Sequence, residues 1–267
     1  MDQKTFGRLR DIVHEESGIA LSPAKRALLL ARTAKRVRAL GLAGYDEYLR
    51  ALEADESGLE LAEFLDAVST NVTSFFREPE HFDFVRSFVD ESIKSGRTRL
   101  RVWSAGCSSG EEPYSLAMTI LDAADTRSLD ARVLATDINT HTLTTARLGE
   151  YSDVKARSIP VRLRNQYMER RGSREDRTWV AGEDLRRLVL FRRLNLARAP
   201  FPMTGPLDIV FCRNVMIYFD QDTRRRLLGE VHRLMRSGGL LIVGHAESLA
   251  SRSGLFTLRG PSVLVKG

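Results

Sequence analysis

The chain has 267 residues, of which 43% are hydrophobic and 28% are charged. This is a globular composition, which excludes a disordered chain, and every apolar stretch is far shorter than the roughly 18 residues needed to cross a bilayer. The start of the chain lacks the basic flank and apolar run of a secretory signal, and two cysteines are too few for a disulfide framework. These features together predict a cytoplasmic protein.

The net charge of +6 and the isoelectric point of about 9.6 favour an acidic partner. Nucleic acid, an anionic membrane surface and an acidic protein all meet that condition. The distribution of the basic residues along the chain therefore has to decide among them.

Residues 1–70 show helical patterns only. The apolar residues of the first helix recur at helical spacing: Phe6, Leu9, Ile12 and Val13. This helix is expected to end at Gly18, because glycine is a common helix terminator. A second helix is predicted over residues 24–40, with Ser22 as its N-cap and Pro23 in its first turn.

The second helix carries a basic stripe within an arc of roughly 100°. Its members are Lys25, Arg32, Lys35 and Arg36. No acidic residue lies between Ser22 and Tyr45. A solvated charged face and a docking surface for an acidic partner explain this stripe equally well.

From residue 99 onward, strands alternate with helices, a pattern that predicts an α/β fold with a parallel sheet covered by helices. The predicted strands are 100–104, 132–136, 188–195, 207–212 and 240–243, and the predicted helices are 112–124, 140–148 and 223–235. Residues 158–187 break the pattern, because they are rich in Arg, Gly and Asp and contain one clear strand fragment at residues 179–180. We interpret this segment as an insertion.

The first strand runs into a glycine-containing turn, which is followed by Glu111, Glu112 and a helix. Such a turn lets a ligand approach backbone N–H groups closely, but the dinucleotide and Walker fingerprints are both absent. Carboxylates at a helix entrance repel a pyrophosphate and suit an ammonium or sulfonium group. S-adenosylmethionine carries both of these cations and no phosphate. Alternatively, the two glutamates merely complement the helix dipole.

Polar residues follow two further strands. Asp137 ends the second strand, where an acid can bind the ribose hydroxyls of an adenosine ligand, although an isolated Asp there is more often a helix cap. The strand at 207–212 leads into Arg213, Asn214 and Tyr218 at the edge where open parallel sheets bind ligands. The N-P-P-Y or D-P-P-Y pattern of nucleobase-amine methyltransferases is absent there. A core role for Tyr218 and a loop-cap role for Asn214 are the structural alternatives.

Five segments together resemble the chemotaxis receptor methyltransferase family, CheR, across nearly the whole chain. They are residues 70–78, 109–115, 135–138, 211–220 and 238–248. The resemblance implies an α/β fold in three parts. A small all-α N-terminal domain (1–70) and a linker that contributes to the cofactor site (71–98) precede a Rossmann-like S-adenosylmethionine-dependent methyltransferase domain (99–267). A small β-subdomain is inserted in the last part at about 158–187.

The resemblance also implies the reaction, in which glutamate side chains of methyl-accepting chemotaxis receptors are methylated and S-adenosylhomocysteine is released, without a metal. The implied cofactor residues are Asn71, Thr73, Arg77, Glu111 or Glu112, Asp137, Asn195, Leu196, Arg213 and Asn214. Arg77 and Tyr218 would orient the reacting groups. The basic stripe would dock on acidic receptor helices, so the protein would meet the membrane only through the receptor. We expect a monomer that binds no nucleic acid.

Two other functions remain open from the sequence. An RNA or small-molecule methyltransferase with the same cofactor fold fits the high isoelectric point, but Trp179 is the clearest stacking residue in the Arg-rich insertion, and single-strand binders usually need several. A non-catalytic, cofactor-sensing protein that docks on receptors is the second alternative. The acidic positions and Tyr218 argue against it.

Overall fold

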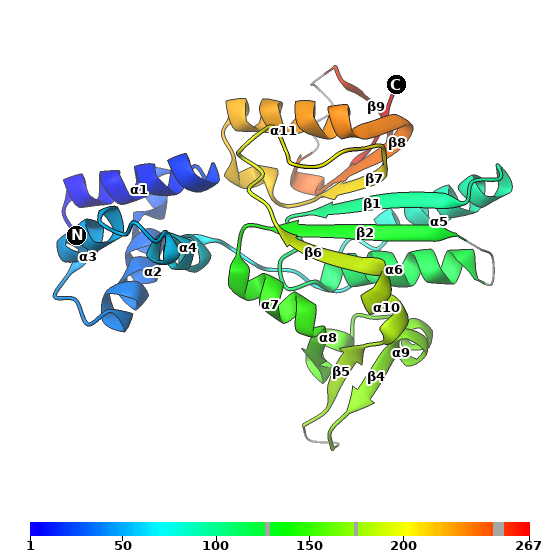
Figure 1. Ribbon diagram of the computed structural model, residues 1–267, viewed down its shortest axis with the longest axis horizontal. Helices are drawn as coiled ribbons and strands as arrows, with labels where there is room; N and C mark the ends of the chain where they lie inside the picture. The colour runs from blue at the N-terminus through cyan, green and yellow to red at the C-terminus, as the bar shows by residue number, and fades with distance from the viewer. Residues whose placement is uncertain (126–128, 174–175, 248–253) are drawn as a thin grey trace.

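The computed structural model describes residues 1–125, 129–173, 176–247 and 254–267, and it shows a helical domain beside a larger α/β domain (Figure 1). Ser248 and Arg174, which belong to sequence segments discussed above, lie outside the described residues. Among the residues described, no helix is both long enough and apolar enough to cross a membrane.

The helical domain is built around a small apolar core. Its elements are α1 (Gln3–Ser17), the 3-10 turn η1 (Pro23–Lys25), α2 (Arg26–Ala39), α3 (Tyr45–Glu53) and α4 (Leu59–Val68). All of the helices contribute buried side chains, among them Leu9, Leu29, Tyr48 and Phe64. The predicted end of α1 at Gly18 is present, with φ at 73° in the left-handed region. The predicted capping bond from the Ser22 side chain is absent, and the second helix begins with a 3-10 turn instead of an α-turn.

The larger domain contains a seven-stranded sheet in the order β6-β2-β1-β7-β8-β10-β9. The strands are β1 (Arg99–Ala105), β2 (Asp130–Asp137), β6 (Val189–Arg193), β7 (Leu207–Cys212), β8 (Met235–Val243), β9 (Phe256–Gly260) and β10 (Val263–Lys266). The first five are mutually parallel, and β10 runs antiparallel to both of its neighbours. This confirms the predicted Rossmann-like class. The chain order reverses between β1 and β7, which is where sheets of this kind bind ligands.

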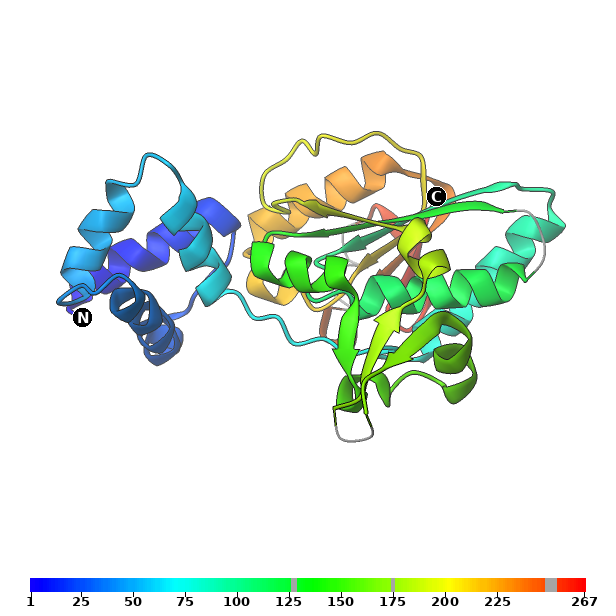
Figure 2. The same cartoon turned by 60° about the horizontal axis from the view of Figure 1, so that its bottom comes forward.

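Helices cover both faces of the sheet (Figure 2). One face packs against α5 (Glu80–Lys94), α6 (Glu111–Ala124), α7 (Thr140–Leu148) and α10 (Glu183–Leu188). The other face packs against α11 (Gln221–Leu234) and the loop around Phe201. Both apolar layers are continuous with the buried strands, so the parallel strands are packed on both faces.

A small antiparallel sheet in the order β3-β5-β4 is inserted between α7 and α10. It consists of β3 (Glu150–Ser152), β4 (Met168–Arg171) and β5 (Thr178–Ala181), with α8 (Asp153–Ala156) and α9 (Val161–Tyr167) between the first two strands. The first strand therefore lies ahead of residue 158, where the sequence pattern placed the start of the insertion. A three-residue strand is too short to show a period of two.

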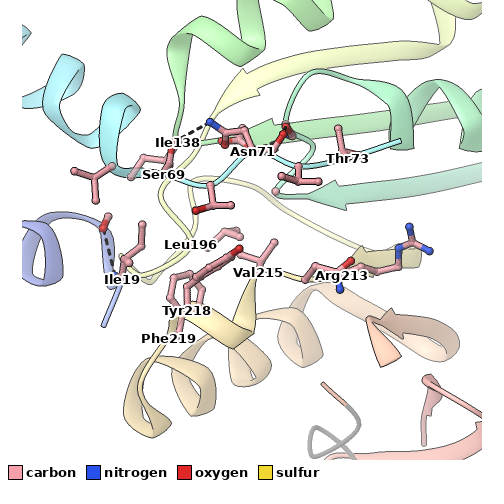
Figure 3. Close-up of a pocket in the computed structure, with 18 of the residues that line it drawn as sticks. Ile19, Ser69, Asn71, Thr73, Ile138, Leu196, Arg213, Val215, Tyr218 and Phe219 are labelled. Carbon is pink, nitrogen blue, oxygen red and sulfur yellow. Dashed lines mark hydrogen bonds between the residues drawn. The ribbon is translucent and has the colours of Figure 1, made fainter. Parts of the chain in front are cut away.

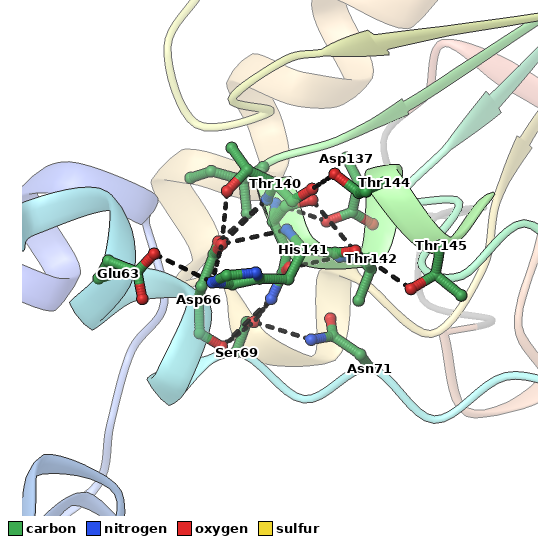
Figure 4. A network of polar contacts seen from close by, with 12 residues as sticks. Glu63, Asp66, Ser69, Asn71, Asp137, Thr140, His141, Thr142, Thr144 and Thr145 are labelled. Atoms are coloured by element: carbon green, nitrogen blue, oxygen red, sulfur yellow. Dashed lines mark hydrogen bonds and ion pairs between the residues drawn. The ribbon is translucent and has the colours of Figure 1, made fainter. Parts of the chain in front are cut away.

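Polar contacts connect the helical domain to the start of α7 in the α/β domain (Figure 4). The Asp66 carboxylate on α4 accepts hydrogen bonds from the backbone N–H and the hydroxyl of Thr140, at 3.1 and 2.7 Å. Glu63 lies 3.1 Å from the His141 ring nitrogen, and the Asn139 amide donates to the Asp66 carbonyl at 3.1 Å. Acids at a helix N-terminus satisfy free N–H groups and complement the helix dipole. Helix α4 thus supplies a cap to a helix of the other domain.

Candidate active site

A cleft lies between the helical domain, the linker and the carboxyl ends of the parallel strands. Its empty volume is about 1010 Å³, a figure that includes open solvent at its mouth. Figure 3 shows the linker residues Asn71 and Thr73 on one side of the cleft, with Val215 and Tyr218 on the opposite side. The cleft is thus at the sheet edge where the sequence predicted a ligand.

The structure brings together all of the predicted cofactor residues except one. Those that line the cleft are Asn71, Thr73, Arg77, Glu112, Asp137, Asn195, Leu196, Arg213 and Asn214. Tyr218 lines it as well, and so does Lys25 from the basic stripe. The exception is Glu111.

Glu111 is fully buried and binds the small β-subdomain instead of facing the cleft. Its Oε1 accepts a hydrogen bond from Lys155 Nζ at 2.6 Å, and its Oε2 accepts one from the Ser109 hydroxyl at 2.6 Å. The Tyr151 hydroxyl donates to the Ser109 carbonyl at 2.8 Å. Of the two adjacent acids, Glu112 is the one available to a ligand, and Glu111 anchors the glycine-containing turn to the subdomain.

The turn requires glycine at two positions. Gly106 has φ at 83°, and a Cβ there would lie 2.4 Å from Val215 Cγ2. Gly110 has φ at 95°, and a Cβ there would lie 2.8 Å from the Tyr151 hydroxyl oxygen. Both φ values lie in the region that favours glycine, and both contacts are too close for any side chain. The turn is therefore packed tightly between Val215 and Tyr151.

Asp137 is held at the end of β2 by two backbone N–H groups. Its Oδ2 accepts from Ser108 at 2.8 Å, and its Oδ1 accepts from Asn139 at 2.9 Å. Burial raises the pKa of the Asp137 carboxyl, while these hydrogen bonds oppose the rise. The helix-cap alternative does not apply, because Asn139 caps α7 by accepting from Thr142 N at 2.8 Å. Each Asp137 oxygen keeps acceptor capacity for a hydroxyl of the ligand.

A buried ion pair joins three segments of the site. Glu112 Oε2 accepts a hydrogen bond from Arg213 Nε at 3.0 Å, and its Oε1 accepts from the Ser104 hydroxyl at 2.8 Å. Arg213 Nη1 donates to the Arg77 carbonyl at 2.6 Å and approaches His81 Nδ1 at 3.0 Å. The Arg213 side chain is 2% exposed. Arg213 therefore connects the end of β7, the start of α6 and the linker.

Tyr218 is presented by a loop that a buried carboxylate organises. Glu247 accepts hydrogen bonds from the backbone N–H groups of Gly244, Asn214 and Ile217, at 2.9, 2.6 and 3.1 Å. Asn214 has φ at 59°, an uncommon conformation for a residue other than glycine. Burial raises the pKa of the Glu247 carboxyl. Glu247 had no predicted role, although a glutamate four residues after the end of a buried strand is a signal that could have indicated one.

The two predicted orienting groups face the cleft without a strong partner. Arg77 Nη1 donates to the Val72 carbonyl at 3.1 Å, and no carboxylate among the described residues pairs with its guanidinium. Tyr218 is partly exposed, and within the described part of the chain its hydroxyl makes no hydrogen bond. Lys25 Nζ lies 5.5 Å from the centre of the Tyr218 ring. The core role considered for Tyr218 is therefore wrong.

Family models cover almost the whole chain. The model described as "CheR methyltransferase, all-alpha domain" matches residues 4–69, and "CheR methyltransferase, SAM binding domain" matches residues 71–263. The chain belongs to the CheR methyltransferase family. It is an S-adenosylmethionine-dependent chemotaxis methyltransferase, and the carboxylates of Glu112 and Asp137 in its cleft suit a cationic ligand that carries a ribose.

Curated relatives agree with this assignment over most of their length. The chain is 37% identical to a chemotaxis protein methyltransferase of Klebsiella aerogenes, over 97% of this chain and 88% of that protein. It is 38% identical to the Escherichia coli protein of the same name, over 97% and 89%. The corresponding protein of Borreliella burgdorferi is 35% identical, over 94% of this chain and 90% of that one.

Among the residues that the structure describes, this CheR methyltransferase contains one group of side chains with the spacing of a cation site, namely Glu78, His81 and His245. The Arg213 guanidinium lies 3.0 Å from His81 Nδ1 and 3.7 Å from Glu78 Oε2. A metal ion at this position would face a fixed positive charge. We therefore assign no metal to the group.

The burial of His81 predicts that the free energy of unfolding decreases at acidic pH. Burial, and next the adjacent Arg213, lower the pKa of His81 to about 4, while an unfolded histidine keeps its ordinary value of 6.5. The unfolded chain therefore takes up a proton first as the pH falls, and stability decreases between about pH 6.5 and 4. This difference corresponds to roughly 3 kcal/mol. We expect chemical unfolding curves to show that decrease in the wild type and a much smaller one in His81→Asn, which keeps an acceptor for Arg213. Equal slopes in the two proteins would contradict the assignment.

The basic stripe is divided among several environments. Arg36 pairs with Glu60 and Glu63 on α4, at 2.6 and 2.9 Å, and its side chain is 19% exposed. Arg32 donates to backbone carbonyls at the end of α4, including that of Val68. Lys25 lines the cleft, and Lys35 is exposed. The geometry therefore leaves Lys35 as the member that points to solvent without serving the domain's own packing.

Proposed function

We propose that this protein methylates glutamate carboxylates of methyl-accepting chemotaxis receptors, producing glutamate methyl esters and S-adenosylhomocysteine. The observation that carries the proposal is that the Arg77 guanidinium, which pairs with no carboxylate among the described residues, and the Tyr218 hydroxyl lie in one cleft with Glu112 and Asp137. A guanidinium and a phenol suit a carboxylate substrate. The names of the curated relatives, all chemotaxis protein methyltransferases, support the same substrate class.

The proposed reaction requires the substrate carboxylate to be positioned and does not require it to be activated by a base. A glutamate side chain has a reference pKa near 4.3, so its carboxylate is already ionised at neutral pH and no general base is required. Bound S-adenosylmethionine would supply the methyl group from its sulfonium, and the carbon–sulfur electron pair would leave with S-adenosylhomocysteine as the glutamate oxygen takes the methyl group. Arg77 holds the carboxylate, and Tyr218 directs it by a hydrogen bond. Such orientation supplies several kcal/mol of barrier reduction.

The remaining residues hold the cofactor. Glu112 binds the methionyl ammonium group, Asp137 the ribose hydroxyls, and Asn195 with Leu196 the adenine region. Asn71 and Thr73 close the site from the linker side, and Arg213 and Asn214 complete the wall. Because the Glu112 charge is compensated by Arg213, Asp137 contributes the uncompensated negative charge beside a cationic ligand.

One experiment tests the proposed reaction directly. The protein is incubated with methyl-labelled S-adenosylmethionine and membranes that contain chemotaxis receptors, and matched membranes without receptors serve as the control. We expect base-labile label on the receptor protein, because carboxyl methyl esters hydrolyse in base. Label confined to RNA would favour the nucleic-acid alternative. Cofactor binding without any label would favour the non-catalytic, receptor-docking alternative.

Lys35, the exposed member of the basic stripe, is expected to contribute to receptor docking. Lys35→Glu is expected to slow receptor methylation by about threefold to tenfold at low salt, because it reverses a charge that steers acidic receptor helices. The effect should shrink as salt is added. Initial rates are compared with those of Lys94→Glu, which reverses an exposed lysine at the far end of α5. Both variants should bind S-adenosylhomocysteine normally, and equal rates for the two would contradict docking through Lys35. Arg32 and Arg36 are unsuitable here because their reversal breaks contacts inside the domain.

A further inference from the structure

The turn that follows α1 lies directly against the segment that carries Tyr218. Ile19 forms an antiparallel β-bridge with Phe219, and the Ala20 N–H donates to the Tyr218 carbonyl at 2.7 Å. Figure 3 shows Ile19 at the same end of the cleft as Tyr218 and Phe219. The side of the cleft next to Tyr218 is therefore formed by the helical domain. The backbone of Tyr218 is tied to that domain as well as to its own loop.

The end of α1 also contacts the loop that follows β6. The Glu16 carbonyl accepts a hydrogen bond from Asn195 Nδ2 at 2.6 Å, and the Glu16 carboxylate pairs with Arg198. His14 lies 2.7 Å from the carboxylate of Asp220, which is the N-cap of α11. One stretch of the helical domain thus contacts both the residue proposed for the adenine region and the segment that follows Tyr218.

Gly18 allows this close approach. It has φ at 73°, and a Cβ built on it would lie 2.5 Å from Ala197 Cβ and 3.2 Å from Thr223 Cγ2. Gly41, at the end of α2, has a similar φ of 66°, but a Cβ there would meet no heavy atom within 4 Å. The two glycines therefore share the conformational requirement for a left-handed residue, and they differ in the contact across the domain interface.

We infer that residues 16–21 are a positioning element of the active site, through which the helical domain fixes Tyr218 and Asn195. This inference rests on the proposed role of Tyr218 in methyl transfer. Under it, the helical domain contributes to turnover and to cofactor binding in addition to any receptor docking. Lys35, the exposed member of the basic stripe, lies on α2 and makes none of these contacts, so docking through Lys35 is separate from the positioning turn.

The test compares Gly18→Ala with Gly41→Ala. Both substitutions force alanine into the left-handed region, but only the first inserts a methyl group between the domains. We expect Gly18→Ala to lower kcat for receptor methylation by about tenfold, since a displacement of about 1 Å can have effects of this size. It should also weaken S-adenosylhomocysteine binding in calorimetry by about threefold to tenfold. Gly41→Ala should stay within twofold of the wild type in both measurements.

A compensating substitution separates positioning from general damage. Ala197→Gly removes the atom that the new methyl group meets, so the double variant Gly18→Ala/Ala197→Gly should recover most of both losses. If Gly18→Ala does not fold, Ala197→Val introduces a similar clash from the other domain and leaves α1 intact. Equal losses in Gly18→Ala and Gly41→Ala, or no recovery in the double variant, would overturn the inference.

A second readout distinguishes failure of this inference from failure of the proposed function. Amide hydrogen exchange at Ala20 reports the bond to the Tyr218 carbonyl without any receptor. We expect faster exchange in Gly18→Ala than in Gly41→Ala, together with the weaker S-adenosylhomocysteine binding. If the wild type methylates no receptor but these two differences persist, the positioning element stands and the substrate assignment fails. Unchanged exchange and unchanged binding in Gly18→Ala would refute the positioning element itself.

Discussion

Arg213→Met is expected to lower the free energy of unfolding by about 3–5 kcal/mol and to abolish measurable binding of S-adenosylmethionine. The substitution leaves the Glu112 carboxylate buried without its partner, and it releases the Arg77 carbonyl from the bond that holds the linker. A buried charge that loses its partner destabilises a protein far more than an exposed one. Denaturant unfolding and calorimetry with the cofactor measure the two effects.

A double-mutant cycle tests whether the ion pair is the cause. Glu112→Gln removes the carboxylate charge, so adding it to Arg213→Met should cost less than the two single changes combined. Arg236→Met is the matched control, because Arg236 pairs with the buried Asp208 at 2.6 Å and does not line the cleft. It should lose stability and keep cofactor affinity. If Arg213→Met bound the cofactor as Arg236→Met does, the proposed role of the pair in the site would fail.

The sequence predicted most of the cleft because its residues lie at the ends of strands. Continuous apolar runs identify buried parallel strands, and the first polar residues after them necessarily gather at one edge of the sheet. Asp137 and Arg213 were found in this way. The family resemblance added the linker residues, such as Asn71, which no periodic pattern places near the sheet.

The sequence could not distinguish Glu111 from Glu112. Adjacent residues on a helix point about 100° apart, so only one of them can face a ligand, but which one depends on tertiary packing. In the structure the decisive group is Lys155, which comes from the inserted subdomain and pairs with Glu111. Nothing in the local pattern around residue 111 indicates that partner.

The basic stripe shows the same limit. A helical wheel groups side chains by direction but does not reveal which neighbouring helix each direction meets. Arg36 turns toward Glu60 and Glu63, more than twenty residues away, and Lys25 turns into the cleft. The charge pattern therefore identified the basic stripe, but the packing of neighbouring elements determines which of its side chains can contact a partner.

Tyr218→Phe is expected to reduce kcat for receptor methylation by about 10- to 100-fold while leaving S-adenosylhomocysteine affinity unchanged. The negative charge on the attacking carboxylate falls as the new bond forms, so the phenol contributes orientation and does not stabilise developing charge. Loss of orientation lowers turnover without weakening the bound cofactor. The control is Tyr45→Phe, since the Tyr45 hydroxyl lies in the helical domain at 3.5 Å from the Leu30 carbonyl. Initial rates at saturating receptor measure the effect.

Arg77→Ala should act mainly on the receptor KM, because a guanidinium binds the carboxylate before and during transfer. If Arg77 and Tyr218 orient the same carboxylate, the double variant should lose less activity than the product of the single losses, since the second change removes a contact already made ineffective. Fully multiplicative losses would mean that the two groups act on different parts of the reaction.

The kcat for receptor methylation should be nearly constant between about pH 6 and 8, because the glutamate nucleophile is ionised throughout this range. A steep rise in kcat across that interval would instead require a titrating base and would contradict catalysis by orientation alone.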